Sequence, residues 1–136
     1  MKIGNYSLYS IVTSKFSLDG GAMFGIIPKP LWEKEVPADC HNRIKMVTRS
    51  LLLVSTDRKI IIDTGNGEKW QKKFRDIYDI DTKTVSLNSS LKHHGYSPEE
   101  ITDVFCTHLH FDHAGGNTRL DRVKIVPTFP NVTYWI

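Results

Sequence analysis

The chain has 136 residues, of which 40% are hydrophobic and 24% are charged, and its formal net charge is +3 at pH 7. This composition is ordinary for one small globular domain and excludes a disordered chain. The basic excess is mild and contains no dense run of Lys or Arg, so it does not indicate a nucleic-acid-binding surface. With only two cysteines, Cys40 and Cys106, and no apolar stretch long enough to cross a membrane, we expect a cytoplasmic protein with neither membrane nor nucleic-acid partners.

The first third of the chain predicts one strand and little other regular structure. Residues 6–16 are rich in Tyr, Ile, Val and Thr and favour a strand, which Asp19-Gly20-Gly21 then ends. Residues 22–27 are apolar and are followed by Pro28 and Pro30, and residues 31–42 are expected to form a loop.

A pair of strands is predicted next. Residues 43–55 and 59–62 favour strands, with a turn at residues 56–58. The three isoleucines of the second strand, Ile60-Ile61-Ile62, show no alternation with polar residues, so we expect this strand to be covered on both faces. A glycine-rich loop, Asp63-Thr64-Gly65-Asn66-Gly67, follows it.

Two helices are predicted in the middle of the chain. The first presents apolar residues at helical spacing and is expected to face the core; these residues are Trp70, Phe74, Ile77 and Tyr78. A second short helix contains Leu91 and stops at Gly95, a residue type favoured just beyond a helix C-terminus.

The last third predicts two further strands. Ser97, Pro98 and Glu100 form a capping-box pattern for a helix of about one turn. Residues 104–106 and 123–126 then favour strands. The order is mostly strands with helices interposed between some of them, so the fold class is mixed α and β (α+β).

A dense group of metal-ligand residues follows the strand at residues 104–106. The group is His108-Leu109-His110-Phe111-Asp112-His113, and Ala114-Gly115-Gly116 comes next. Side chains two apart in an extended segment point to the same side, so His108 and His110 can bind one ion together. Imidazole and carboxylate suit zinc and similar divalent ions. We expect the glycines to let the backbone turn sharply near the metals.

This motif resembles that of the metallo-β-lactamase superfamily. The strand followed by Asp63-Thr64-Gly65 is similar to a second element of that superfamily. Residues 19–25 and 127–131 resemble segments of the branch that contains lactonases and organophosphate hydrolases. The resemblance implies an αββα sandwich with a binuclear metal site at one edge. It also implies that residues 1–136 form a single domain unit, the N-terminal half of a metallo-β-lactamase-fold domain.

The resemblance also assigns roles to individual residues. His108 and His110 would bind the first metal, and Asp112 and His113 would bind the second. Asp63 would lie beneath the site in the second shell and hold a ligand in place. An alternative for Asp63 is a carboxylate that caps amides of its own loop. The ions are expected to be zinc, with iron, manganese and cobalt as alternatives.

The activity implied by the resemblance is metal-dependent hydrolysis. A hydroxide shared by two metals would attack an ester, lactone or phosphoester of a small-molecule substrate. Asp112 is the candidate catalytic residue, because as a metal ligand it would also orient that hydroxide. Met23 and Phe24 either line an apolar substrate pocket or pack in the core.

The chain departs from the family in its supply of ligands. Family members provide three more ligands from a second half, whereas no His follows His113 here. Zinc normally has at least three protein ligands, and this chain offers two for each ion. Spare candidates are His41, His93, His94, Cys40 and Cys106. Either the chain is a fragment of a longer hydrolase, or it is a short product that depends on a partner chain.

Two function classes therefore stay open. The first is a metal-dependent hydrolase whose site is completed by the missing C-terminal half or by a partner chain. The second is a non-catalytic metal-binding or interaction module, in which the half-site is complete as it stands. A nuclease ranks last, because a basic, aromatic-rich patch is absent.

Overall fold

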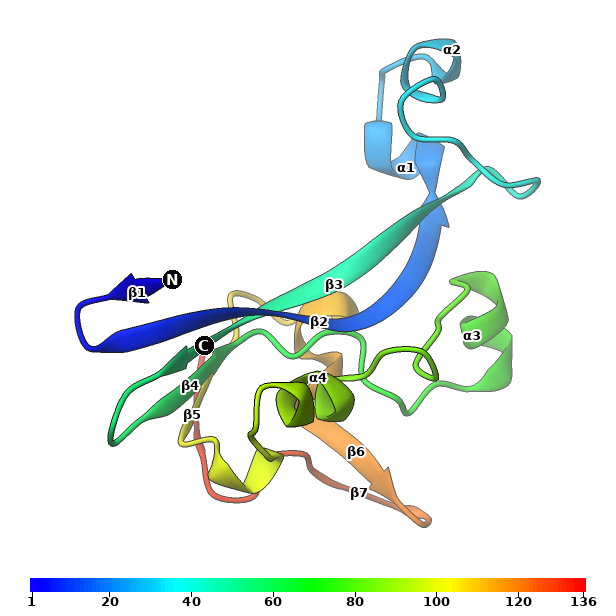
Figure 1. The fold of residues 1–136 in the computed structure, drawn as a ribbon. Coiled ribbons are helices and arrows are strands. Elements are labelled where there is room, and N and C mark those ends of the chain that lie inside the picture. The colour runs from blue at the N-terminus through cyan, green and yellow to red at the C-terminus, as the bar shows by residue number, and fades with distance from the viewer.

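The computed structural model describes residues 1–136, which form a long, curved sheet accompanied by short helices (Figure 1). The strands are β1 (Lys2–Ile3), β2 (Tyr6–Asp19), β3 (Arg43–Val54), β4 (Lys59–Ile62), β5 (Asp103–Phe105), β6 (Thr118–Asp121), β7 (Lys124–Pro127) and β8 (Thr133–Trp135). The helices are α1 (Gly20–Phe24), α2 (Lys29–Trp32), α3 (Lys72–Ile77), α4 (Leu87–His93), η1 (Pro98–Glu100), α5 (Phe111–Ala114) and η2 (Gly115–Asn117). The predicted mixture of α and β structure is confirmed.

The pairing of the strands brings two loops to the same edge of the sheet. Six strands follow the order β1-β2-β3-β4-β5-β8, and β6 and β7 form a separate pair. β4 pairs in parallel with β5, and Ile62 lies opposite Phe105. Because the carboxyl ends of parallel strands meet at one edge, the loop after β4 and the loop after β5 leave the sheet side by side. The first loop begins with Asp63, and the second carries the histidine motif.

A single core lies between the sheet and α4. Leu52, Ile61 and Val104 lie opposite one another on neighbouring strands and are each 0% exposed. Leu91 of α4 is also fully buried and belongs to the same cluster. Burying a side chain of this size stabilises the fold by ~1.5–3 kcal/mol. Leu91 of α4 therefore shares one buried cluster with the central residues of β3, β4 and β5.

The opposite face of β4 and β5 is only partly covered. Ile60 and Ile62 keep intermediate exposure, and Phe105 and Trp135 are 40% and 45% exposed. The rings of Phe105 and Trp135 stack on each other, with centroids 5.7 Å apart. The prediction that the isoleucine strand is covered on both faces is therefore wrong for residues 1–136, because the core forms on the α4 side alone.

The helix predicted around Trp70 is real but does not face the core. α3 begins at Lys72 and contains no buried residue, and Phe74 and Ile77 are 41% and 48% exposed. Trp70 and Tyr78 flank the helix and pack against Phe111 instead. The spacing of the apolar residues therefore indicated a helix correctly, but the expected burial of that helix in the core is wrong.

Other local predictions agree with the structure to within a few residues. Ser97 and Glu100 form a reciprocal capping box at η1, which is one turn long. Gly95 follows the end of α4 with φ of +83°. The predicted strand at 123–126 is β7, and it pairs with β6, which was not predicted.

The expected loop at 31–42 instead begins inside α2. Trp32 ends this helix, is 5% exposed, and stacks on Phe24 with ring centroids 4.7 Å apart. This aromatic contact gives the segment a packed partner, which explains why it is ordered as a helix. The longest helix, α4, has seven residues, and none of the helices has the length and apolar character needed to cross a membrane.

Candidate metal centre

The candidate ligands lie on the segment that leaves the sheet after β5. His108 and His110 are on the stretch between β5 and α5, and both are exposed. α5 comprises Phe111–Ala114 and carries Asp112 and His113, whose side chains are 27% and 34% exposed. The stretch after β5 therefore carries two of the four groups and the short helix carries the other two.

The three histidines of the motif are close together. The ring centroids of His108 and His110 are 4.7 Å apart, and those of His108 and His113 are 3.9 Å apart. The carboxylate Oδ2 of Asp112 lies 3.6 Å from Nε2 of His113. The structure thus brings together His108, His110, Asp112 and His113 at one edge of the sheet, and their assignment to two metal ions stays a prediction.

Asp63 contacts this group from the end of β4. Its Oδ2 lies 2.8 Å from Nδ1 of His113, and its Oδ1 accepts a hydrogen bond of 2.8 Å from the backbone N–H of Thr107. The Thr107 hydroxyl also donates to this carboxylate and lies 3.0 Å from Nδ1 of His108. The partners of Asp63 are therefore on the segment after β5, and no amide of its own loop is among them.

The environment of Asp63 favours the ionised carboxylate. Burial raises the pKa of Asp63, but the hydrogen bonds from His113 and Thr107 outweigh burial, so the net pKa lies below its ordinary value. An ionised Asp63 is a strong acceptor for a hydrogen on Nδ1 of His113, and this contact leaves Nε2 on the side of the ring away from Asp63. The backbone of Asp63 has φ of +57°, a left-handed conformation that Asp tolerates better than most residues.

Two glycine-containing loops interlock beneath the motif. The backbone N–H of Thr64 donates to the carbonyl of His113 at 2.7 Å, and that of Gly116 donates to the carbonyl of Gly65 at 3.0 Å. A Cβ on Gly115 would lie 2.3 Å from the carbonyl oxygen of Asn66, and one on Gly116 would lie 2.2 Å from that of Thr64. These glycines do not adopt left-handed turns, since neither has a positive φ and Gly115 has a helical φ of −59°. They allow the close approach of two backbones instead.

Asn117 connects the site to the core and has no counterpart in the sequence predictions. Its Oδ1 accepts a hydrogen bond of 3.0 Å from the Thr64 hydroxyl, and its Nδ2 donates to Sγ of Cys106 at 3.2 Å. Cys106 is 6% exposed and belongs to the core cluster, so it packs as an apolar residue. Thr107 and Asn117 were both missed, because only their long-range partners reveal a role.

The remaining spare ligand candidates lie elsewhere. Cys40 and His41 are exposed on the loop before β3, and His93 and His94 lie at the end of α4. His94 packs against Tyr9, with ring centroids 4.9 Å apart. The structure therefore brings none of these four residues to the motif.

The donors of the motif fit divalent metal ions in their chemistry. They are imidazole nitrogens and one carboxylate, all reachable from solvent, and a carboxylate orients one imidazole as ligating histidines are usually oriented. No group of three or more His, Cys, Asp or Glu side chains is arranged to hold a single ion. The residues present are thus a suitable but partial donor set.

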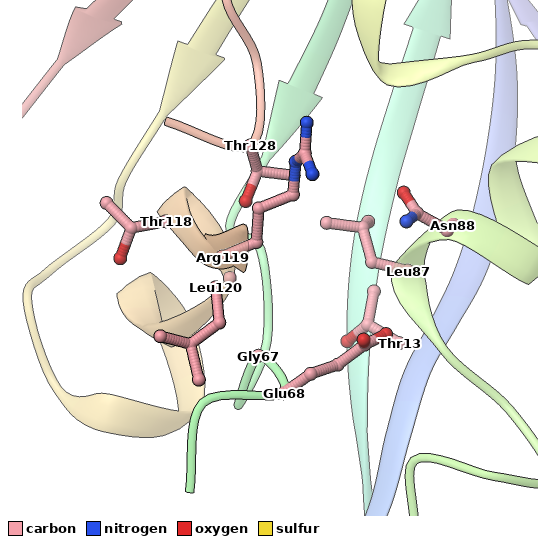
Figure 2. A pocket seen from close by; sticks show the side chains of 10 residues that line it. Thr13, Gly67, Glu68, Leu87, Asn88, Thr118, Arg119, Leu120 and Thr128 are labelled. Carbon is pink, nitrogen blue, oxygen red and sulfur yellow. The ribbon is translucent and has the colours of Figure 1, made fainter. Parts of the chain in front are cut away.

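A polar cavity of 240 Å³ lies on another side of the interlocked loops (Figure 2). Thr13 lies on one side of it with Leu87 and Asn88 of α4, and Arg119 and Leu120 lie on the other side. The backbones of Gly67 and Gly116 also line it, and none of the four candidate ligands does. This cavity is therefore separate from the histidine cluster.

Comparison with known proteins places this arrangement in a family. The family model of the metallo-β-lactamase superfamily matches residues 45–135. An N-acyl homoserine lactonase from Bacillus sp is 59% identical over 84 residues, which are 55% of this chain and 34% of the relative. A second N-acyl homoserine lactonase, from Bacillus cereus, is 30% identical over 94 residues, which are 62% of this chain and 38% of the relative. The chain thus matches little more than a third of the length of these curated relatives.

Solved structures share the fold. A probable metal-dependent hydrolase from Staphylococcus aureus superposes with a TM-score of 0.86 at 33% identity, and the match covers 98% of this chain and 47% of that one. AidC, a dizinc quorum-quenching lactonase, matches with a TM-score of 0.69 at 23% identity over 98% of this chain and 42% of its own, a likeness of fold alone. The matched family model, the shared fold and the clustered histidines agree, and the chain belongs to the metallo-β-lactamase superfamily.

Proposed function

We propose that this chain supplies metal-binding residues to a hydrolase that opens lactone rings, with N-acyl homoserine lactones as the first substrates to test. The observation that carries the proposal is the contact of Asp63 with His113 beside His108 and His110. The choice of lactones over other esters and phosphoesters rests on the curated relatives, which are N-acyl homoserine lactonases.

The proposed metals are two divalent ions, with zinc as the first candidate. His108 and His110 would hold one ion, and Asp112 and His113 would hold the other. Bound divalent ions supply Lewis acidity and make water a better nucleophile near neutral pH. Asp63 keeps the His113 ring oriented through its Nδ1–H, and Asp112 presents its carboxylate beside that ring, where it would orient the attacking water.

Residues outside 1–136 would complete the donor set. This chain offers two donors for each proposed ion, whereas zinc sites usually have at least three protein ligands. The chain spans 47% of the Staphylococcus aureus hydrolase, so further ligands have room on the rest of such a fold or on a partner chain. We propose that residues 1–136 are one unit, the N-terminal half of a metallo-β-lactamase-fold domain.

Metal content and lactone cleavage test this function together. A protein that contains residues 1–136 together with the residues that complete the donor set is dialysed against zinc-containing and then metal-free buffer. It is compared with its His110→Ala variant and with its His93→Ala variant, at an exposed histidine of α4 outside the motif. We expect His110→Ala to lose bound zinc while His93→Ala keeps it. Cleavage of N-hexanoyl homoserine lactone, followed by chromatography, is expected only in samples that retain metal. Equal zinc in all three proteins, or cleavage that does not depend on His110, contradicts the proposal.

A non-catalytic metal-binding module is the second candidate, and one observation favours it. Three donor groups do not converge on a single point within residues 1–136. This candidate predicts that the wild-type chain binds zinc through His108 and His110 but cleaves neither lactone, ester nor phosphotriester. Turnover that is lost in His110→Ala would exclude it.

A further inference from the structure

The helix that carries Asp112 and His113, α5, is too short to be stable without contacts to other segments. α5 has four residues, and isolated helices below ~12–15 residues are marginal in water. None of its residues is fully buried, and only Ala114, its last residue, packs against the edge of the core cluster. Its orientation relative to Asp63 must therefore come from contacts with other segments.

Lys69 contacts the carboxyl end of this helix. Its Nζ donates a hydrogen bond to the carbonyl of Gly115, the residue that caps α5. A cation at a helix C-terminus satisfies a free carbonyl and interacts favourably with the helix dipole. Lys69 makes no salt bridge, since none of the chain's ion pairs includes it. Burial lowers the pKa of its ammonium group, so the contact lies in a partly desolvated environment.

Trp70, the next residue, contacts the other end of the same helix. Its ring packs edge-on against Phe111, the first residue of α5, with centroids 5.5 Å apart and an interplanar angle of 85°. Its Nε1–H donates a hydrogen bond of 2.9 Å to the carbonyl of Asn66. Trp70 therefore joins the start of α5 to the loop that begins at Asp63.

Two consecutive side chains thus span α5 from end to end and connect it to the Asp63 loop. We propose that Lys69 and Trp70 are positioning residues that hold Asp112 and His113 in register with Asp63, and thereby set the affinity of the second metal position. This inference rests on the proposed function for the identity of the ion. The geometric part, that Lys69 fixes α5, does not depend on metal.

The test compares three lysine variants in the metal-free and metal-loaded chain. Lys69→Met keeps the aliphatic stem and removes the ammonium donor, and Lys69→Arg keeps a cationic donor. Lys72→Met is the matched control, because Lys72 lies on α3 with a side chain 87% exposed and pairs only with Asp76. Hydrogen exchange of residues 107–117 reports on α5 without metal. Cobalt(II) titration, followed by the visible absorption of the bound ion, reports on each metal position.

We expect Lys69→Met to raise the exchange rate of the α5 amides while α4 stays protected. It should also weaken the second equivalent of cobalt by ~10-fold, as removal of an outer partner of a ligand commonly does, and leave the first equivalent unchanged. Lys69→Arg should recover most of the affinity, and Lys72→Met should match the wild type in both measurements.

Different failures separate the inference from the proposed function. A wild-type chain that binds no cobalt contradicts the proposed function, and the exchange data then decide the inference alone. Unchanged exchange in Lys69→Met overturns the positioning role. Equal weakening of both cobalt equivalents, or no recovery with Lys69→Arg, also overturns it, because either result indicates general destabilisation instead of a specific contact with α5.

Discussion

Asp63 Oδ2 lies 2.8 Å from His113 Nδ1, although 50 positions of sequence separate the two residues. The parallel pairing of β4 with β5 makes this contact possible, because Asp63 directly follows β4 and His113 lies on α5, the first helix after β5. An ionised carboxylate at this position favours a hydrogen on Nδ1 of His113, and the contact leaves the other nitrogen on the side of the ring away from Asp63.

The first prediction concerns Asp63 itself. Replacing it with Ala removes the partner of the His113 Nδ1–H, and zinc affinity should fall by ~10–100-fold, the usual cost of losing an outer-shell partner. Isothermal titration of zinc into the metal-free protein measures the change. Asp121→Ala, at an exposed carboxylate of β6, serves as the control. An affinity within a factor of about three of the wild type would show that Asp63 does not orient a ligand.

The interlocked glycines give a second prediction. Gly116→Ala places a Cβ 2.2 Å from the Thr64 carbonyl oxygen, so the two loops must separate. We expect a loss of ~1–3 kcal/mol in the free energy of unfolding, as for other overpacked sites. Gly21→Ala is the control, because the nearest atom to its Cβ would be a side-chain oxygen of Asp19 at 3.1 Å. Urea denaturation that finds equal stability for the two variants would contradict this account.

A third prediction follows from the low pKa of Asp39. The backbone N–H of Arg43 is the main cause, with further hydrogen bonds from the Arg43 side chain and the His41 amide, and the pKa of Asp39 falls to about 2. A carboxyl whose pKa is depressed on folding stabilises the fold above its unfolded value, and this contribution is lost as pH falls through the folded value. A carbon-13 titration of the folded protein should therefore place the Asp39 midpoint below 3.8. A midpoint at or above that value would contradict the observed hydrogen bonds.

A fourth prediction tests the buried face of the sheet. Ile61 is 0% exposed and packs in the α4 cluster, so Ile61→Ala should lower the free energy of unfolding by ~2–5 kcal/mol. Ile125→Ala, at a residue of β7 that is 64% exposed, should change it by less than ~0.5 kcal/mol. Similar losses in the two variants would mean that the core does not lie on the α4 side of the sheet.

Local patterns in the sequence were enough to predict much of this fold. The β-branched and apolar runs at residues 6–16, 43–55 and 59–62 correspond to β2, β3 and β4, because strand preference depends mainly on short stretches. The capping residues Ser97 and Glu100 hydrogen-bond within one turn, so their role could also be predicted directly from the sequence. The metal motif was recognisable because its four candidate ligands are almost contiguous.

Features that depend on distant partners could not be predicted in the same way. The apolar spacing around Phe74 indicated a helix, but spacing does not show whether a core lies opposite, and this residue is 41% exposed. The hydrogen bond from Lys69 to Gly115 joins residues 46 positions apart, and no local sequence pattern indicates it. Asn117 was missed for the same reason, since its partners Thr64 and Cys106 lie far away in the sequence, on the segments that follow β4 and β5.

The interlocking of the loops after β4 and β5 has a consequence for how the chain folds. The backbones of Thr64 and Gly65 hydrogen-bond to those of His113 and Gly116, so the histidine cluster contacts Asp63 only after the long segment between them has closed. Closure of such a segment costs entropy before any contact compensates for it, so this pairing is expected to form late. Because Asp63 orients the proposed ligand His113 only after this closure, a bound ion should favour the native chain over the unfolded one and slow its unfolding.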